Sequence, residues 1–188
     1  PHGSNPHNVH VAVFANDAER VVVGAERGTV PGQFLPDMVP NNAVIAAGGM
    51  PRGAADTGAV LRDLGKDVAY LGYDIVGAGH SEAGANSAVG VSNIVRPSDG
   101  TSPPPDANRY FAVGINTPHS PHIISHPNII NIRIGGDPVS SAVLGPSTSP
   151  EVTLSGKYGE VLDSYYKPTN IDHQLLFTPY NILLEPNT

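Results

Sequence analysis

Hydrophobic residues recur with a period of two in short segments along the chain. In one such segment, Val9, Val11 and Val13 alternate with His10 and Ala12. Because successive side chains of a strand point to opposite faces, this alternation predicts strands with one buried face. Short strands bounded by Pro, Gly, Asn and Ser are typical of a mainly β fold, and we expect an antiparallel sandwich or jelly roll. The predicted strands are 9–14, 21–23, 43–47, 68–76, 89–95, 111–115, 130–134, 152–155, 175–177 and 182–184.

One segment has helical periodicity instead, and we expect one short helix near residues 51–64. Pro51 suits the first helical position, where its missing N–H would have no partner, and Gly65 suits the position after the last turn. The apolar positions recur at intervals of three and four residues. They are Thr57, Val60, Leu61 and Leu64.

The length of 188 residues predicts a single domain with a core of its own. Gly (21) and Pro (19) are frequent, and both residues disfavour long helices. We expect residues 1–8 to be a flexible leader. Residues 97–108 contain three consecutive prolines and predict an exposed, stiff loop.

Charged residues make up only 14% of the chain, and its net charge is −7. The low charged fraction favours an extracellular location or a place on a particle surface. The few cations form no basic stripe, so we expect no nucleic-acid partner. No apolar run is long enough to span a bilayer, so we expect no membrane insertion. The absence of cysteine excludes disulfides, thiolate metal sites and cysteine nucleophiles.

Three histidines lie close together between two prolines: His119, His122 and His126. Neutral imidazoles are common metal ligands, and three of them can hold Zn²⁺ or Cu²⁺ with one position left open. The alternative is a His-rich exposed loop without metal. Under our preferred function, no cofactor is required.

Residues 79–83 (GHSEA) come near the Gly-x-Ser-x-Gly motif that places a nucleophilic serine, here Ser81, at the end of a strand. Asp137 or Asp163, followed by His173, could supply the acid and the base in the order that this motif requires. The Gly- and Ala-rich residues after the motif are poor helix formers, whereas a helix has to follow such a serine. We therefore interpret this segment as a Gly-rich loop.

Two local resemblances point to different enzyme families. Residues 52–72 (RGAADTGAVLRDLGKDVAYLG) resemble the N-terminal signature of ribokinase-type sugar kinases, with Asp56 in place of the usual Asn. Residues 72–87 (GYDIVGAGHSEAGANS) are similar to the strand and loop before the nucleophile in α/β-hydrolases, and residues 108–116 (NRYFAVGIN) to a segment of their acyltransferase relatives. Because the two resemblances imply different folds, we transfer no functional residue from either.

The preferred function is therefore non-catalytic: a structural subunit of a homo-oligomeric extracellular or particle assembly, of the coat, capsid or filament type. Its partners would be copies of itself, joined when Val9, Val11 and Val13 complete a neighbour's sheet. One alternative is a metal-dependent enzyme or metalloprotein that uses the histidine cluster. Another is a carbohydrate-binding module built on late tyrosines. These are Tyr158, Tyr165, Tyr166 and Tyr180.

Overall fold

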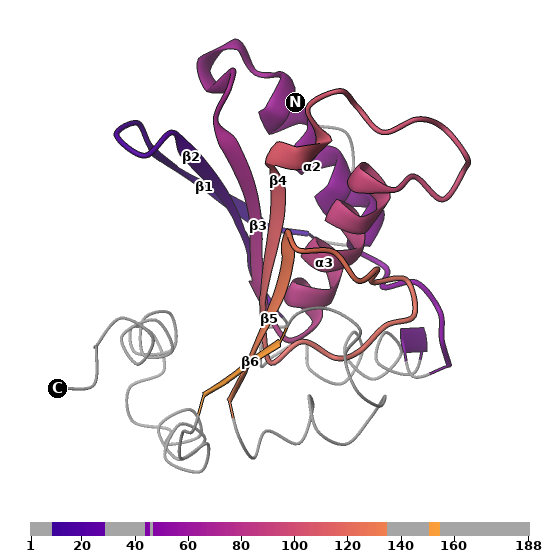
Figure 1. Cartoon of the computed structure of the whole chain (residues 1–188). Coiled ribbons are helices and arrows are strands. Elements are labelled where there is room, and N and C mark those ends of the chain that lie inside the picture. The colour runs from indigo at the N-terminus through magenta and orange to yellow at the C-terminus, as the bar shows by residue number, and fades with distance from the viewer. Residues whose placement is uncertain (1–8, 29–43, 46, 135–150, 155–188) are drawn as a thin grey trace, which may run out of the picture.

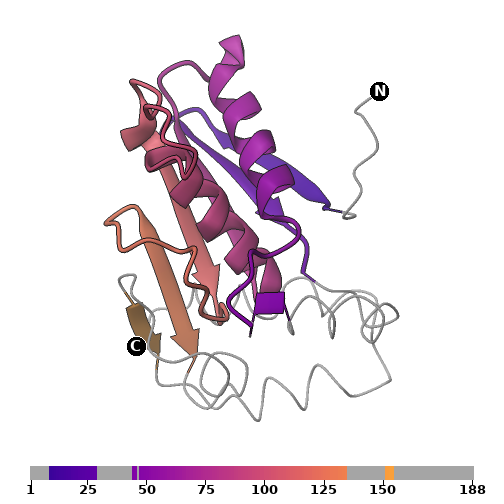
Figure 2. The same ribbon diagram turned by 90° about the vertical axis from the view of Figure 1, so that its right-hand side faces the viewer.

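A six-stranded sheet with two helices packed on one face organises the part of the chain that the structure describes (Figures 1 and 2). This computed structural model describes residues 9–28, 44–45, 47–134 and 151–154. The elements, with two short 3₁₀ helices labelled η, follow in chain order. They are β1 Val11–Asn16, β2 Val21–Glu26, α2 Ala54–Lys66, η3 Val68–Tyr70, β3 Asp74–His80, α3 Glu82–Val95, η4 Ala107–Arg109, β4 Tyr110–Ile115, β5 Ile129–Ile134 and β6 Glu151–Leu154.

The sheet is mostly parallel, and its strands lie in the order in which they occur in the chain. β1 and β2 form an antiparallel hairpin, and every later neighbouring pair, from β2–β3 to β5–β6, is parallel. Parallel neighbours need crossover connections, and α2 and α3 provide them between β2 and β3 and between β3 and β4. The prediction of an antiparallel sandwich or jelly roll is therefore wrong.

Helix α2 overlaps the predicted helix at 51–64 and begins at Ala54. It packs along α3, and the two backbones come close where Gly58 faces Gly90. A Cβ atom added to Gly90 would lie 3.0 Å from the backbone nitrogen of Gly58, so any larger residue here would push the two backbones apart. The small residues that weaken each helix locally let the two helices pack tightly against each other.

Helix α3 replaces the strand predicted at 89–95. Of its 14 residues, 11 are buried, among them Ala85, Val89 and Ile94. A helix that is buried on almost every side has no polar face, and so it lacks the pattern by which a helix is recognised in a sequence. Val89 and Val91, which are separated by Gly90, have the alternating spacing that is typical of a strand.

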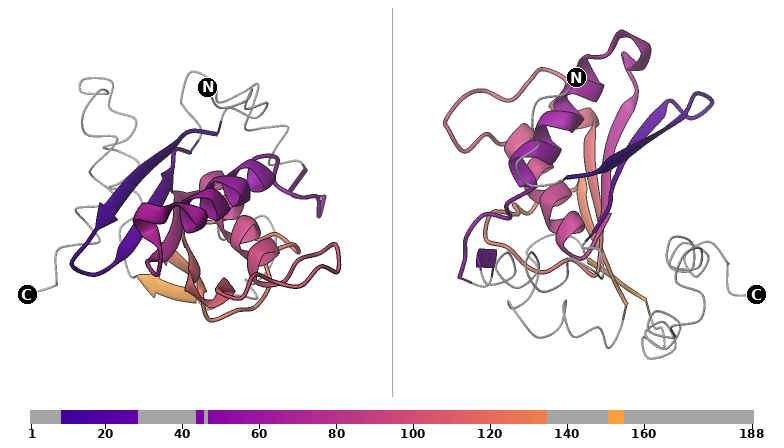
Figure 3. Two further views of the ribbon diagram at one scale, coloured as in Figure 1. Left: turned by 90° about the horizontal axis from the view of Figure 1, so that it is seen from above. Right: turned by 180° about the vertical axis from the view of Figure 1, so that it is seen from behind.

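The core lies between the sheet and the two helices. Val22, Ile75 and Ala112 face it from the strands, and Leu61 and Val89 from the helices. The β1–β2 hairpin leans away from the other strands (Figure 3), and on it Val13 and Phe14 are 44% and 62% exposed. Most of the proline-rich segment predicted as a loop is exposed, and it ends in η4.

Several predicted segments lie outside the described residues: the leader 1–8, the strands 175–177 and 182–184, and the late tyrosines. In the described part of the chain, no helix is long and apolar enough to cross a membrane. Residues Val11 and Val13 belong to β1, which pairs with β2 of the same chain. Self-association through this segment stays a prediction.

Candidate active site

Ser81 is the single residue between the end of β3 and the beginning of α3, and its backbone is strained. Its φ of 56° and ψ of −124° lie outside the regions that L-residues normally adopt, including the left-handed helical region. Such a conformation costs roughly 1–3 kcal/mol, and it is found where the surrounding structure forces it, often at functional sites. The strand, the strained serine and the helix together form the turn that Gly-x-Ser-x-Gly motifs make.

Small residues on either side of Ser81 permit this sharp turn. A Cβ atom added to Gly79 would lie 2.7 Å from the backbone nitrogen of Gly84 and would overlap Ala83. A Cβ atom on Gly84 would lie 3.2 Å from the Cα of Gly114 on β4 and would overlap Thr117. Interpreting residues 79–83 as a loop is therefore wrong, because the Gly- and Ala-rich sequence is what lets α3 pass so close to the sheet.

Hydrogen bonds hold Ser81 on both sides of the turn. Its N–H donates to the carbonyl oxygen of Ile115 at the end of β4 (2.9 Å), and its own carbonyl accepts from the N–H of Ala85 in α3 (3.2 Å). The residue is half-buried. It stands at the N-terminus of a 14-residue helix, where the helix dipole favours negative charge.

The end of β2 lies beside this turn. Glu26, the last residue of β2, is opposite Gly79 in the parallel register. Two residues later, a Cβ atom added to Gly28 would lie 3.2 Å from the carbonyl oxygen of His80. The carboxyl ends of parallel strands, where α/β proteins hold their ligands, thus bring the chain after β2 next to Ser81.

Glu26 carries a buried carboxyl group with two hydrogen-bond donors. Thr57 of α2 donates its hydroxyl to Oε2, and Asn86 of α3 donates its amide to Oε1, both at 2.7 Å. Burial raises the pKa of Glu26 from 4.5 to about 7, because the charged form loses its hydration. The two hydrogen bonds lower this pKa, while the negative charges of Glu82 and Asp56 add to the rise.

Ser81 is recognisable from the motif around it, whereas Glu26 is not among the residues predicted from the sequence, although the sequence carries a signal for it. The buried residues of β2 are Val22, Gly24 and Glu26, which share one face of the strand. A carboxylate in phase with apolar core positions has to be protonated or hydrogen-bonded. The predicted strand 21–23 ends before Glu26, whereas β2 continues to this residue, and so the prediction does not include Glu26 among the inward-facing positions.

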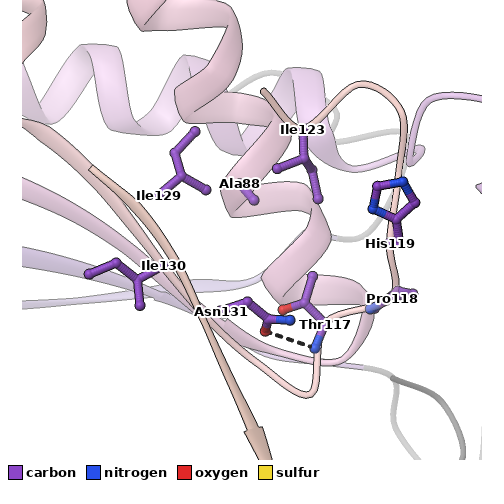
Figure 4. A pocket seen from close by; sticks show the side chains of 9 residues that line it. Ala88, Thr117, Pro118, His119, Ile123, Ile129, Ile130 and Asn131 are labelled. Atoms are coloured by element: carbon purple, nitrogen blue, oxygen red, sulfur yellow. Dashed lines mark hydrogen bonds between the residues drawn. The ribbon is translucent and has the colours of Figure 1, made fainter. Parts of the chain in front are cut away.

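A small cavity lies beneath α3, near the turn (Figure 4). It has room for about one water molecule. The N–H of Thr117 donates to Oδ1 of Asn131 at its edge (3.3 Å). The cavity is lined by Ala88, Gly114, Thr117, Pro118, His119, Ile123, Ile129, Ile130 and Asn131.

The three histidines of the predicted metal site make separate contacts. His119 lines the small cavity, and Nε2 of His122 is 3.1 Å from the carbonyl oxygen of Gly48. Nδ1 of His126 accepts from the N–H of Asn128 (3.2 Å). Among the described residues, no three His, Asp or Glu side chains are grouped so that they could hold a metal ion.

The mostly parallel sheet, with helices crossing over it and a strained serine after a central strand, defines the α/β-hydrolase fold. Among solved structures, the chain is similar to the Lip2 lipase from Yarrowia lipolytica, with a TM-score of 0.51 and 15% sequence identity. The match covers 79% of this chain and 61% of Lip2. The chain thus spans less than two thirds of the length of that lipase.

Two other lipases match with TM-scores below 0.5. The lipase from Rhizopus microsporus var. chinensis has a TM-score of 0.48 and 15% identity, over 79% of this chain and 58% of that one. The triacylglyceride lipase from Rhizomucor miehei has a TM-score of 0.48 and 13% identity, over 88% and 74%. No protein-family model and no curated protein sequence matches the chain.

The fold overturns the predicted function as well as the predicted architecture. A non-catalytic structural subunit was inferred from a jelly roll and from the absence of a complete catalytic motif. The chain instead has the fold of Lip2 and the strand–serine–helix turn of hydrolases. The preference for a structural assembly protein over an enzyme is therefore wrong, and so is the jelly-roll architecture on which it depended.

Proposed function

We propose that this chain is a serine hydrolase that cleaves carboxylic esters, with Ser81 as the nucleophile. The observation that carries the proposal is the backbone conformation of Ser81 at the β3–α3 turn. Strain of this kind presents the serine hydroxyl above the end of the sheet, where a substrate carbonyl can reach it. The fold shared with Lip2, itself a lipase, supports the same class of reaction.

In this reaction the Ser81 oxygen attacks the ester carbonyl while a histidine takes its proton. The negative charge that develops on the carbonyl oxygen would be stabilised by the N–H of the residue after the serine, here Glu82, at the start of α3. A second donor would come from the chain that follows β2, which passes His80 at Gly28. Collapse of the intermediate releases the alcohol, and water then hydrolyses the acyl-serine.

The sequence offers partners for Ser81 in the required order. Asp137 comes three residues after the end of β5, whose carboxyl end lies at the same edge of the sheet as that of β3. We therefore propose Asp137, rather than Asp163, as the acid. His173 is the one histidine that follows β6 in the sequence, and we propose it as the base. Asp137, Asp163 and His173 lie outside the described part of the chain.

Covalent labelling tests the nucleophile directly. We expect a fluorophosphonate to modify Ser81, and we expect the purified chain to hydrolyse p-nitrophenyl acetate and butyrate. The Ser81→Ala variant should lose the label and at least about 10³-fold in kcat, because the attacking atom is gone. Peptide mass spectrometry locates the label. Ser87, which lies buried in α3 six residues after Ser81, provides a matched Ser→Ala control that should keep both label and activity.

A chain that folds but takes no label at Ser81 and cleaves neither ester would contradict the proposed function. An extracellular location is proposed on the low charged fraction of the chain alone. A place on a particle surface is no longer proposed, because it depended on the structural-subunit hypothesis.

A further inference from the structure

Glu26 lies where three elements meet behind the turn at Ser81. Its backbone ends β2, opposite Gly79 of β3. Its two carboxyl oxygens accept from Thr57 of α2 and from Asn86 of α3, both at 2.7 Å. The side chain is only 8% exposed, so no solvent competes strongly with these two bonds.

Glu26 is connected to both sides of the proposed oxyanion site, to one through its hydrogen bond with Asn86 and to the other through its own backbone. Asn86 belongs to α3, the helix that begins directly after Ser81 and carries the N–H of Glu82. The chain that leaves Glu26 runs through Gly28, which packs against the carbonyl oxygen of His80. A displacement of the carboxyl group would therefore change the distance between Gly28, two residues after Glu26, and the start of α3.

We propose that Glu26 is a positioning residue of the esterase site, whose ionised carboxylate holds the end of β2 against the N-terminal half of α3. This inference rests on the proposed function. The ionised form accepts from both donors and strengthens both bonds. A protonated carboxyl has to donate one bond, and the Asn86 nitrogen has no lone pair to accept it. Either the bond to Thr57 must reverse or the Asn86 amide must turn its Oδ1, which has no hydrogen-bond partner, toward Glu26.

The titration of Glu26 falls near neutral pH. Burial raises its pKa to about 7, and the charged groups that add to the rise are Glu82 on α3 and Asp56 on α2. The residues opposite Glu26 on the flanking strands, Val11 on β1 and Gly79 on β3, carry no charge. The alignment of the site should therefore improve as the pH rises through about 7.

The experiment compares the full-length wild type with Glu26→Gln, which keeps the shape of the side chain and removes its charge. Because the catalytic base is common to both, the ratio of their kcat values on p-nitrophenyl butyrate isolates the contribution of Glu26. We expect a ratio near one at about pH 5.5, rising to about tenfold at pH 8.5 with little change in KM. Unfolding temperatures confirm that both chains are folded at the assay temperature.

Two further variants separate positioning from a merely structural role. Thr57→Val removes a hydrogen bond that lowers the pKa of Glu26, so kcat should then rise at a higher pH than in the wild type. Glu19→Gln makes the same chemical change on the exposed β1–β2 turn and should match the wild type throughout.

The outcomes for the two proposals are distinguishable. If wild type takes the fluorophosphonate at Ser81 and hydrolyses the ester, but its kcat ratio to Glu26→Gln is independent of pH, only the role of Glu26 is overturned. If the wild type neither takes the label nor hydrolyses the ester, the proposed function is overturned and the positioning role with it.

Discussion

At the scale of single residues, the candidate site combines a strained serine with a buried acid. Ser81 can adopt its unusual backbone because Gly79 and Gly84, which have no Cβ atom, let α3 approach the sheet closely at this turn. Glu26 keeps its carboxyl group in the core because Thr57 and Asn86 provide a donor for each oxygen. Both features are unfavourable in isolation, and the packing around them has to offset their cost.

The buried acid predicts a dependence of stability on pH. Glu26 titrates near 4.5 when unfolded and near 7 when folded, so folding holds its proton more tightly. Its contribution is most favourable below about pH 4.5 and is lost as the pH rises to about 7, by about 3 kcal/mol in total. Glu26→Gln cannot ionise and should not show this loss.

Denaturant unfolding at about pH 4.5 and pH 8 measures the effect. The wild type should lose about 3 kcal/mol more between the two values than Glu26→Gln does. An equal loss in both chains would show that Glu26 does not titrate as its burial implies. The ionised form, which we expect to favour catalysis, is thus the form that destabilises the fold, a trade-off common at active sites.

At the scale of elements, the crossing of α2 and α3 determines where Ser81 stands. α3 is clamped between α2 and the sheet, and its first turn touches Gly114 and Thr117 of the neighbouring strand and loop. Close packing at Gly58 and Gly90 sets the distance between the helices, since each backbone lies directly against the other. A change there should be transmitted along α3 toward its N-terminus.

Gly90→Val tests this crossing. Its side chain would meet the backbone of Gly58, which cannot move aside without displacing α2, so we expect a loss of about 1–3 kcal/mol in the free energy of unfolding. Ala59→Val adds bulk on the exposed face of the same helix pair and should change stability by less than about 1 kcal/mol. Chemical denaturation measures both, and equal stability of the two variants would contradict the proposed close packing.

At the scale of the whole molecule, the sheet gathers the ends of parallel strands at one edge. Ser81 follows β3, and in the sequence Asp137 and His173 follow β5 and β6. Residues distant in the chain can meet at that edge because all of these strands run in the same direction. Which acid and which base act with Ser81 is therefore a question about the whole fold.

Paired substitutions answer that question. His173→Ala and Asp137→Asn should each lower kcat on p-nitrophenyl butyrate by at least about 10³-fold, because Ser81 loses its base or the base loses its orientation. His119→Ala and Asp163→Asn are the matched controls and should stay within a few fold of the wild type. If the controls lose activity instead, the proposed partners of Ser81 are the wrong ones.

Much of the local structure could be predicted from the sequence. The predicted strands at 111–115 and 130–134 differ by one residue from β4 and β5, and the predicted helix overlaps α2. Each of these elements has one buried and one less buried face, so apolar residues recur along its sequence at the spacing of a strand or a helix. The near-match of residues 79–83 to a nucleophile motif was also visible, although its meaning was misjudged.

The tertiary structure alone decided the direction of the strands, the nature of α3 and the environment of Glu26. Alternation has the same period in parallel and antiparallel sheets, so it could not exclude a sandwich. α3 is helical because it is enclosed by α2 and the sheet, whereas its Gly, Ser and Val residues favour a helix only weakly. The strain at Ser81 and the raised pKa of Glu26 exist only once β2, β3 and both helices are packed together, because each arises from contacts between residues far apart in the chain.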